Sequence, residues 1–205
     1  HPNAVLDGFT VRNGRAAGAP PNDRGGGVYI NVKGTLRDCL VFSNSAAGNG
    51  GGVCVATNVL VEGCTIVTNS AAGSGGGLYV AAAAAVSNCI LYFNAAGASE
   101  NYGGGGTFAY TCASPAPAGA RNTGAAPLFA DWPNADLHLA TNSPCIHAGL
   151  YAMWMTGGAD LDGEPRLMGP VDIGADEYTR YHYVTRDGAD ANPGTQLSPW
   201  GTLQY

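Results

Sequence analysis

The sequence contains almost no lysine and few charged residues of any kind. Lys33 is the single lysine, 12% of the 205 residues are charged, and the formal net charge is −6 at neutral pH. Because the chain has no basic cluster, we expect it to bind neither nucleic acid nor an anionic membrane surface. Long apolar runs are missing too. None reaches the roughly 18 residues that a membrane-spanning helix needs, so we expect no membrane span.

A helical pattern is also absent. No stretch of ten or more residues places apolar side chains at helical spacing, and the 32 glycines disfavour helices throughout. Apolar residues instead alternate over short runs such as Val28 to Ile30, which is the period of a strand with one buried face. Since 45% of the residues are hydrophobic, they suffice for a sizeable core. These features indicate an all-β protein.

A phrase of three glycines followed by a short strand returns at a fixed step of about 25 residues, beginning at Gly25, Gly50 and Gly75. A constant period of this size indicates a stacked repeat architecture. Two or three short strands joined by tight turns in each period predict one coil of a parallel β-helix. A leucine-rich repeat is the main alternative, but its L-x-x-L-x-L phrase is missing. Calcium-binding nonapeptide repeats are excluded because no Asp follows the glycines.

A second phrase repeats at the same step and places three cysteines and three asparagines in register. These residues are Cys39, Cys64 and Cys89, and Asn44, Asn69 and Asn94. Stacked coils lie about 4.8 Å apart, so we expect the asparagines to form an amide ladder. We expect the cysteines to form a buried thiol column, because one thiol per coil makes a line and not a tetrahedral metal site. Cys54 falls at an outward position between Tyr29 and Tyr79, and we expect it to be partly exposed.

The two ends of the repeat are irregular. Residues 1–24 form an imperfect coil with Phe9 where Cys39 stands, and residues 15–24 form a longer loop than their counterparts. After Asn94 the period slips, which we interpret as an insertion near residues 100–102. The sequence opens inside a repeat phrase, so we expect it to be part of something larger. We therefore predict β-helix coils over 1–112 and a non-periodic capping segment over 113–178.

The order of phrases after residue 126 resembles the end of a known group of proteins. The phrases are Pro127-Leu128-Phe129, Asp136-Leu137-His138-Leu139, Ser143-Pro144-Cys145-Ile146-His147-Ala148-Gly149, Asp160-Leu161-Asp162-Gly163-Glu164-Pro165-Arg166 and Val171-Asp172-Ile173-Gly174-Ala175-Asp176-Glu177. They resemble secreted bacterial right-handed parallel β-helix repeat proteins with a choice-of-anchor type C-terminal segment. The resemblance spans about residues 5–178 and implies right-handed coils, an irregular C-terminal cap and an extracellular or cell-surface location. His147 departs from the pattern, which has Asp there.

The last segment, 179–205, resembles the beginning of the same β-helices, although it follows their ending. A tandem array, a circular permutation, or docking of this segment onto the uncapped first coil of a neighbour each explain the order. We favour the array or the filament, because an uncapped coil presents unpaired strand edges and a head-to-tail contact does not close. The expected partner is a copy of the chain or an adjacent β-helix module. The expected assembly residues are Tyr183, Val184, Trp200 and Leu203.

Acidic residues concentrate late in the chain, where Asp160, Asp162, Asp172, Asp176 and Glu177 form a cluster whose oxygens suit a hard cation. The weak candidates for a structural calcium site are Asp160, Asp162, Asp187 and Asp190. Structural turns and ion pairs to Arg166 are the favoured interpretation, and we predict no cofactor. The regular coils hold no repeated acid pair of the kind a glycosidase needs. We interpret Lys33, Arg37 and Asp38 as ordinary surface charges, so catalysis is not expected.

The resemblance also implies a disulfide between Cys112 and Cys145, since family members often carry cysteine in both phrases. Spacing alone leaves the pairing open. The aromatic residues Tyr29, Tyr79, Trp132, Trp154 and Trp200 fit either a sugar-stacking surface or, as we favour, core and cap packing. We predict a non-catalytic structural or adhesive surface protein joined end to end through residues 180–205. The alternative is a carbohydrate-active module that binds glycans or resembles a polysaccharide lyase.

Overall fold

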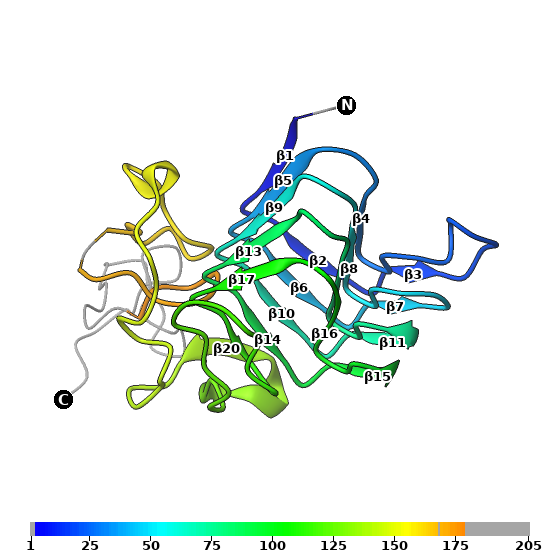
Figure 1. Cartoon of the computed structure of the whole chain (residues 1–205). Coiled ribbons are helices and arrows are strands. Elements are labelled where there is room, and N and C mark those ends of the chain that lie inside the picture. Colours follow the sequence, from blue (N-terminus) through cyan, green and yellow to red (C-terminus); the bar gives the residue numbers. More distant parts are fainter. Residues whose placement is uncertain (1–2, 168, 179–205) are drawn as a thin grey trace, which may run out of the picture.

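The protein is a parallel β-helix, in which successive coils stack along one axis (Figure 1). A computed structural model describes residues 3–167 and 169–178. Leu36 pairs in parallel with Val61, and Val61 with Val86, so equivalent positions recur at a constant step. The all-β solenoid that the repeat predicts is confirmed. No helix in the described ranges is long and apolar enough to cross a membrane.

Four parallel sheets run along the solenoid, so a complete coil contributes four strands. The sequence pattern predicts only two or three strands per coil. Sheet A contains β1 (Ala4–Asp7), β5 (Gly34–Arg37), β9 (Val59–Glu62), β13 (Ala85–Ser87) and β17 (Thr107–Ala109). Sheet B contains β2 (Thr10–Arg12), β6 (Leu40–Phe42), β10 (Thr65–Val67), β14 (Ile90–Tyr92) and β18 (Cys112–Ala113). Sheet C contains β3 (Arg15–Ala16), β7 (Ser45–Ala46), β11 (Ser70–Ser74) and β15 (Ala95–Ala98). Sheet D contains β4 (Val28–Ile30), β8 (Val53–Val55), β12 (Leu78–Val80) and β16 (Tyr102–Gly104).

The core lies inside the coils and is filled by every second residue of the strands. Leu36, Val41 and Val53 belong to it, together with their counterparts in the next coils. The repeated glycines let the chain pass close to its neighbours between sheets C and D. A Cβ atom on Gly51 would lie 2.3 Å from the carbonyl oxygen of Ser70. The glycine triplets therefore recur because the corner has no room for side chains.

The turn between sheets A and B repeats a left-handed backbone conformation. Asp38, Gly63 and Asn88 occupy the same register position, with φ values of 51°, 59° and 52°. Asp, Asn and Gly adopt this conformation most readily. We refer to these three residues as the turn column, because they form a line along one edge of the solenoid.

The last coil is shorter than the others, so the interpretation of an insertion near residues 100–102 is wrong. Leu60 pairs with Ala85, and Ala85 pairs with Thr107, so the last step along sheet A is shorter than the one before it. In this coil Asn101 lies at the register position of Gly77, and its side chain accepts a hydrogen bond from the Asn94 amide at 3.2 Å. The repeat step changes after Asn94 because the last coil contains fewer residues than the coil before it.

Residues 114–125 fold over the end of this last coil. Thr123 forms a parallel bridge with Cys112, and the backbone N–H of Tyr110 donates to the carbonyl of Ala120 at 2.8 Å. The Tyr92 hydroxyl donates to the carbonyl of Gly124 at 3.1 Å. This end of the solenoid is therefore covered by the chain itself.

The remaining non-periodic chain packs on the flank of the solenoid, where Figure 1 shows it in yellow-green to orange. We call residues 126–167 and 169–178 the flank segment. It contains β19 (Phe129–Asp131), the 3₁₀ helix η1 (Trp132–Asn134), β20 (Asp136–Leu139) and the 3₁₀ helix η2 (Met153–Met155). β19 and β20 form an antiparallel pair. A second core joins Leu137, Cys145 and Ile173 to the outward side chains of sheet B, among them Val67 and Ile90. Strand β10 of sheet B is thus buried on both faces.

Candidate functional site

The three register asparagines are buried and hydrogen-bonded along the stack. The Asn44 amide donates to Asn69 Oδ1 at 2.9 Å, and the Asn69 amide donates to Asn94 Oδ1 at 3.1 Å. Each amide also donates to two backbone carbonyls, those of Val41 and Val67 in the case of Asn69. These side chains hold neighbouring coils together where buried polar groups need partners.

The six cysteines lie in three places, and all are buried free thiols. Cys39, Cys64 and Cys89 point into the core and donate to nearby backbone carbonyls, as Cys89 does to Ser87 at 3.1 Å. Burial raises the pKa of the Cys64 thiol well above its usual value, so this thiol is a poor nucleophile.

Cys54 lies in register between Tyr29 and Tyr79, as expected, but only 4% of its surface is exposed. The expectation of partial exposure is wrong, because coils on both sides and the backbone of Gly50 enclose this small side chain.

Cys112 and Cys145 lie in the second core, between β18 and the flank segment. The Cys112 thiol donates to the carbonyl of Ala125 at 3.2 Å, and the neighbouring Cys145 thiol and burial raise the pKa of Cys112. The structure places the two candidates for a disulfide side by side as free thiols.

The turn column is the line along which the flank segment attaches. Arg166 forms an ion pair with Asp38, the ring of Trp154 lies over Gly63, and Leu150 exchanges backbone hydrogen bonds with the Asn88 side chain. Each of these three coils contributes one contact, because its left-handed turn lies at the same register position.

Arg166 is the centre of a buried charge network. Its side chain is fully buried, and it donates to Asp38 and, at 2.8 Å, to Glu177 Oε1. Burial raises the pKa of Asp38 to about 6 and that of Glu177 to about 7, despite the attraction of Arg166. The expected ion pair from Arg166 to the late acids is present. The interpretation of Asp38 as a surface charge is wrong, since the flank segment covers it and leaves it 3% exposed.

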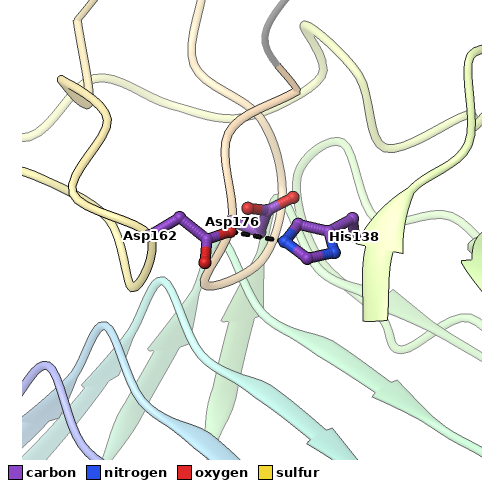
Figure 2. Close-up of side chains that lie close together, drawn as sticks. All are labelled: His138, Asp162 and Asp176. Carbon is purple, nitrogen blue, oxygen red and sulfur yellow. Dashed lines mark hydrogen bonds and ion pairs between the residues drawn. The ribbon is translucent and has the colours of Figure 1, made fainter. Parts of the chain in front are cut away.

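The second charged cluster lies between the flank segment and sheet B, and Figure 2 shows its three central side chains converging. His138 comes from β20, Asp162 from the loop after Asp160, and Asp176 from the loop before Tyr178. One ligand-type atom of each residue lies within 4.8 Å of the other two. His138 Nε2 contacts Asp162, and His138 Nδ1 contacts Asp136.

The electrostatics of this cluster are dominated by carboxylates. Hydrogen bonding to Asp162 raises the pKa of His138 to about 10. Burial, with Asp160 and Asp162 nearby, raises the pKa of Asp176 well above its usual value. The site therefore disfavours a further negative charge and favours a cation.

A pocket of about 200 Å³ opens beside the cluster. Its walls come from the outer face of sheet B and from the flank segment, and they include Thr10, Leu40, His138, Asp162 and Asp176. A neighbouring pocket of about 320 Å³ is lined by Phe42, Trp132 and Pro133. The two share Ala135 and Leu137, so they form adjoining hollows on one flank.

This geometry suits cation or proton binding better than glycoside hydrolysis. The carboxyl groups of a glycosidase are separated by about 5–5.5 Å or about 6.5–9.5 Å across the scissile bond. Here the atoms of Asp162 and Asp176 lie within 4.8 Å of each other, with His138 beside both. Both ring nitrogens of His138 already face carboxylates, so neither is free to act as a general base toward a substrate.

Two of the four predicted metal candidates, Asp160 and Asp162, lie within the described residues. Asp160 is a turn residue, since its Oδ1 accepts backbone N–H bonds from Asp162 at 3.0 Å and Glu164 at 2.9 Å. Asp162 faces His138, whereas Asp187 and Asp190 lie outside the described residues, as does the expected assembly segment. Asp176 belongs to the predicted acid cluster and also faces His138. Sequence reasoning missed His138, because it comes from a phrase that the resemblance treats as structural.

The candidate aromatic residues occupy separate parts of the molecule. Trp132 stacks on Phe93 with ring centroids 4.3 Å apart, and Trp154 lies beside Arg37 and Arg166. Tyr29 and Tyr79 flank Cys54 on sheet D. Trp200 lies outside the described ranges.

No known protein family, curated protein or solved structure matches the chain. The resemblance to secreted β-helix proteins therefore remains a prediction.

Proposed function

We propose that the protein is a non-catalytic structural or adhesive element of an extracellular surface, and that it joins end to end. The observation that carries this proposal is the open first coil. Four apolar side chains are partly exposed there, those of Leu6, Val11, Val28 and Ile30. Their counterparts in the next coil have at most 1% of their surface exposed. Among the described residues, nothing covers the apolar core at this end.

The first coil is also an edge of all four sheets. Strands β1, β2, β3 and β4 each pair on one side only among the described residues. Unpaired parallel edges are templates for a further strand. Phe9 adds apolar surface at this end: it occupies the position of the buried Cys39 and is 56% exposed.

The covered opposite end limits how two copies join. Residues 114–125 fold over β17 and β18, so two coil ends do not stack directly. Residues 179–205 resemble a β-helix start, and their assembly residues Tyr183, Val184, Trp200 and Leu203 supply the missing strand. The partner is the first coil of another copy or of an adjacent module.

The interior is built as structural scaffolding. The asparagine ladder through Asn44, Asn69 and Asn94 couples neighbouring coils, and Arg166 anchors the flank segment. An extracellular location is supported by the resemblance and by the low lysine content.

Negative-stain electron microscopy of the full chain and of a truncation ending at Tyr178 tests this function. We expect linear assemblies from the full chain and single particles from the truncation. Single particles in both samples would contradict end-to-end joining.

Glycan binding is a second candidate, favoured by the pocket that Trp132, Phe42 and Pro133 line. Aromatic rings in a shallow hollow offer a stacking surface for sugars. A glycan array with the chain and its Trp132→Ala variant tests this candidate. Binding that disappears in the variant supports it, and an array without signal contradicts it.

A further inference from the structure

We propose that His138, Asp162 and Asp176 form a binding site for one divalent transition metal ion of the zinc type. The site lies on the flank of sheet B, on the outer side of the solenoid. The three residues offer one imidazole nitrogen and two carboxylate oxygens within 4.8 Å of one another (Figure 2).

The three donors are close enough to share one ion, but His138 Nε2 and Asp162 are in direct contact and must move apart when it binds. Zinc binds His nitrogen and carboxylate oxygen at about 2.0–2.2 Å, so ligand atoms at neighbouring tetrahedral positions lie about 3.4 Å apart. The side chains come from three separate segments of the flank region, all fixed by the second core or by backbone hydrogen bonds. Leu137 and Leu139 on either side of His138 are buried in that core.

Asp136 completes the arrangement expected around a metal-binding histidine. It contacts His138 Nδ1 and also accepts the backbone N–H of His138 at 3.2 Å. Metal-bound histidines commonly donate their second ring N–H to a carboxylate, which fixes the tautomer and the ring orientation. Asp136 thus directs Nε2 toward Asp162 and Asp176.

The charges around the site also favour a cation. Asp160 and Glu164 lie within 4.8 Å of Asp176 on its other side, and the nearby cation Arg166 is engaged by Asp38 and Glu177. When the ion binds, the Nε2–H bond of His138 breaks, the proton passes to buffer, and a metal–nitrogen bond forms.

The donor set distinguishes the ion. Calcium takes six to eight oxygen ligands, whereas an imidazole nitrogen with two carboxylates suits zinc and similar ions. The adjoining pocket of about 200 Å³ leaves room for water at the remaining positions. The proposed site is thus a mixed nitrogen and oxygen site that shares Asp162 and Asp176 with the predicted acid cluster.

Isothermal titration of the EDTA-treated full chain with ZnCl₂ tests the proposal. We expect one ion per chain, with affinity at least about tenfold weaker in His138→Gln and in Asp176→Asn. His147→Gln is the matched control, since His147 is an exposed histidine of the same flank segment, and its affinity should match the unsubstituted chain. Circular dichroism checks that each variant is folded.

X-ray absorption of the zinc-loaded full chain needs no variant. A first shell of one imidazole nitrogen with oxygen ligands supports the site, whereas a sulfur shell would assign the ion to the cysteines and overturn the proposal. Absence of zinc uptake by the folded chain, or equal uptake by a folded His138→Gln variant, also overturns it. Calcium binding that survives His138→Gln, without zinc binding, would contradict the choice of ion.

Discussion

Asn88 and Leu150 exchange two hydrogen bonds between positions far apart in the sequence. The Asn88 amide donates to the Leu150 carbonyl at 2.6 Å, and the Leu150 N–H donates to Asn88 Oδ1 at 2.7 Å. The side chain thus pairs with the flank segment as a strand backbone does. Asn88, Gly63 and Asp38 together form a docking line for the flank segment along one edge of the solenoid.

Replacing Asn88 with glycine should loosen the flank segment without disturbing the coil. Glycine keeps the left-handed turn, as Gly63 shows, but both hydrogen bonds to Leu150 are lost. We expect the free energy of unfolding to fall by about 1–3 kcal/mol, together with faster proteolysis after residue 126. Asn13→Gly is the control, because Asn13 also has a positive φ but is exposed. Equal stability of the two variants would contradict the docking line.

Removing Arg166 should be far more costly than removing a surface arginine. Arg166→Met leaves Asp38 and Glu177 buried without their counter-charge, and breaking such a network costs about 3–5 kcal/mol. Urea denaturation at pH 7.5 measures the loss, with the exposed Arg15→Met as the matched control. A loss below about 1 kcal/mol would show that the network does not hold the flank segment.

Stability should decrease as pH rises from about 4 to about 7. Burial raises the pKa of Asp38 from 3.8 to about 6 in the folded protein. Between these values the folded protein retains a proton that the unfolded chain has released, so raising the pH removes stability. One pKa unit corresponds to about 1.4 kcal/mol, which gives a decrease on the order of 2–3 kcal/mol from Asp38. Glu177 acts in the same direction.

Denaturation curves across this pH range measure the effect. The slope should be smaller in Asp38→Asn, which stays neutral at every pH. Stability that rises from pH 4 to pH 7 would contradict the direction of both shifts.

Oxidation should join Cys112 to Cys145 and leave the thiol column reduced. Cys112 and Cys145 come from two different segments packed together in the second core. The thiols of the column also lie next to one another, but their stacked side chains point the same way and suit a disulfide poorly. In an oxidising buffer, alkylation of the unfolded chain followed by mass spectrometry should modify every cysteine except this pair. A typical disulfide adds about 2–4 kcal/mol of stability. Full alkylation, or a bridge within Cys39, Cys64 and Cys89, would contradict this prediction.

The fold could be predicted because it repeats. A constant step between repeats fixes which residues stack, so the register of Leu36 with Val61 follows from the sequence alone. The open end could not be predicted in detail, since the exposure of Val11 and Val28 depends on what lies above the first coil. The shortened last coil was misread because a slipped period does not distinguish lost residues from added ones.

The flank segment was beyond sequence reasoning for a different reason. It has no period, so nothing local indicates that Arg166 meets Asp38, which lies in a distant part of the sequence. The same limit hid His138, which approaches the late acids Asp162 and Asp176 only in the folded flank segment. Asp162 was identified because its neighbours formed a recognisable acidic phrase.

Sedimentation velocity of two first-coil variants tests end-to-end joining most directly. Phe9 lies at the open end and is 56% exposed, whereas Val5 is 52% exposed and in register with Thr35 on the outer face of sheet A. End-to-end joining predicts that Phe9→Arg yields only monomers, while Val5→Arg assembles like the unsubstituted chain. Assembly of the folded Phe9→Arg variant to the same size as Val5→Arg would contradict it.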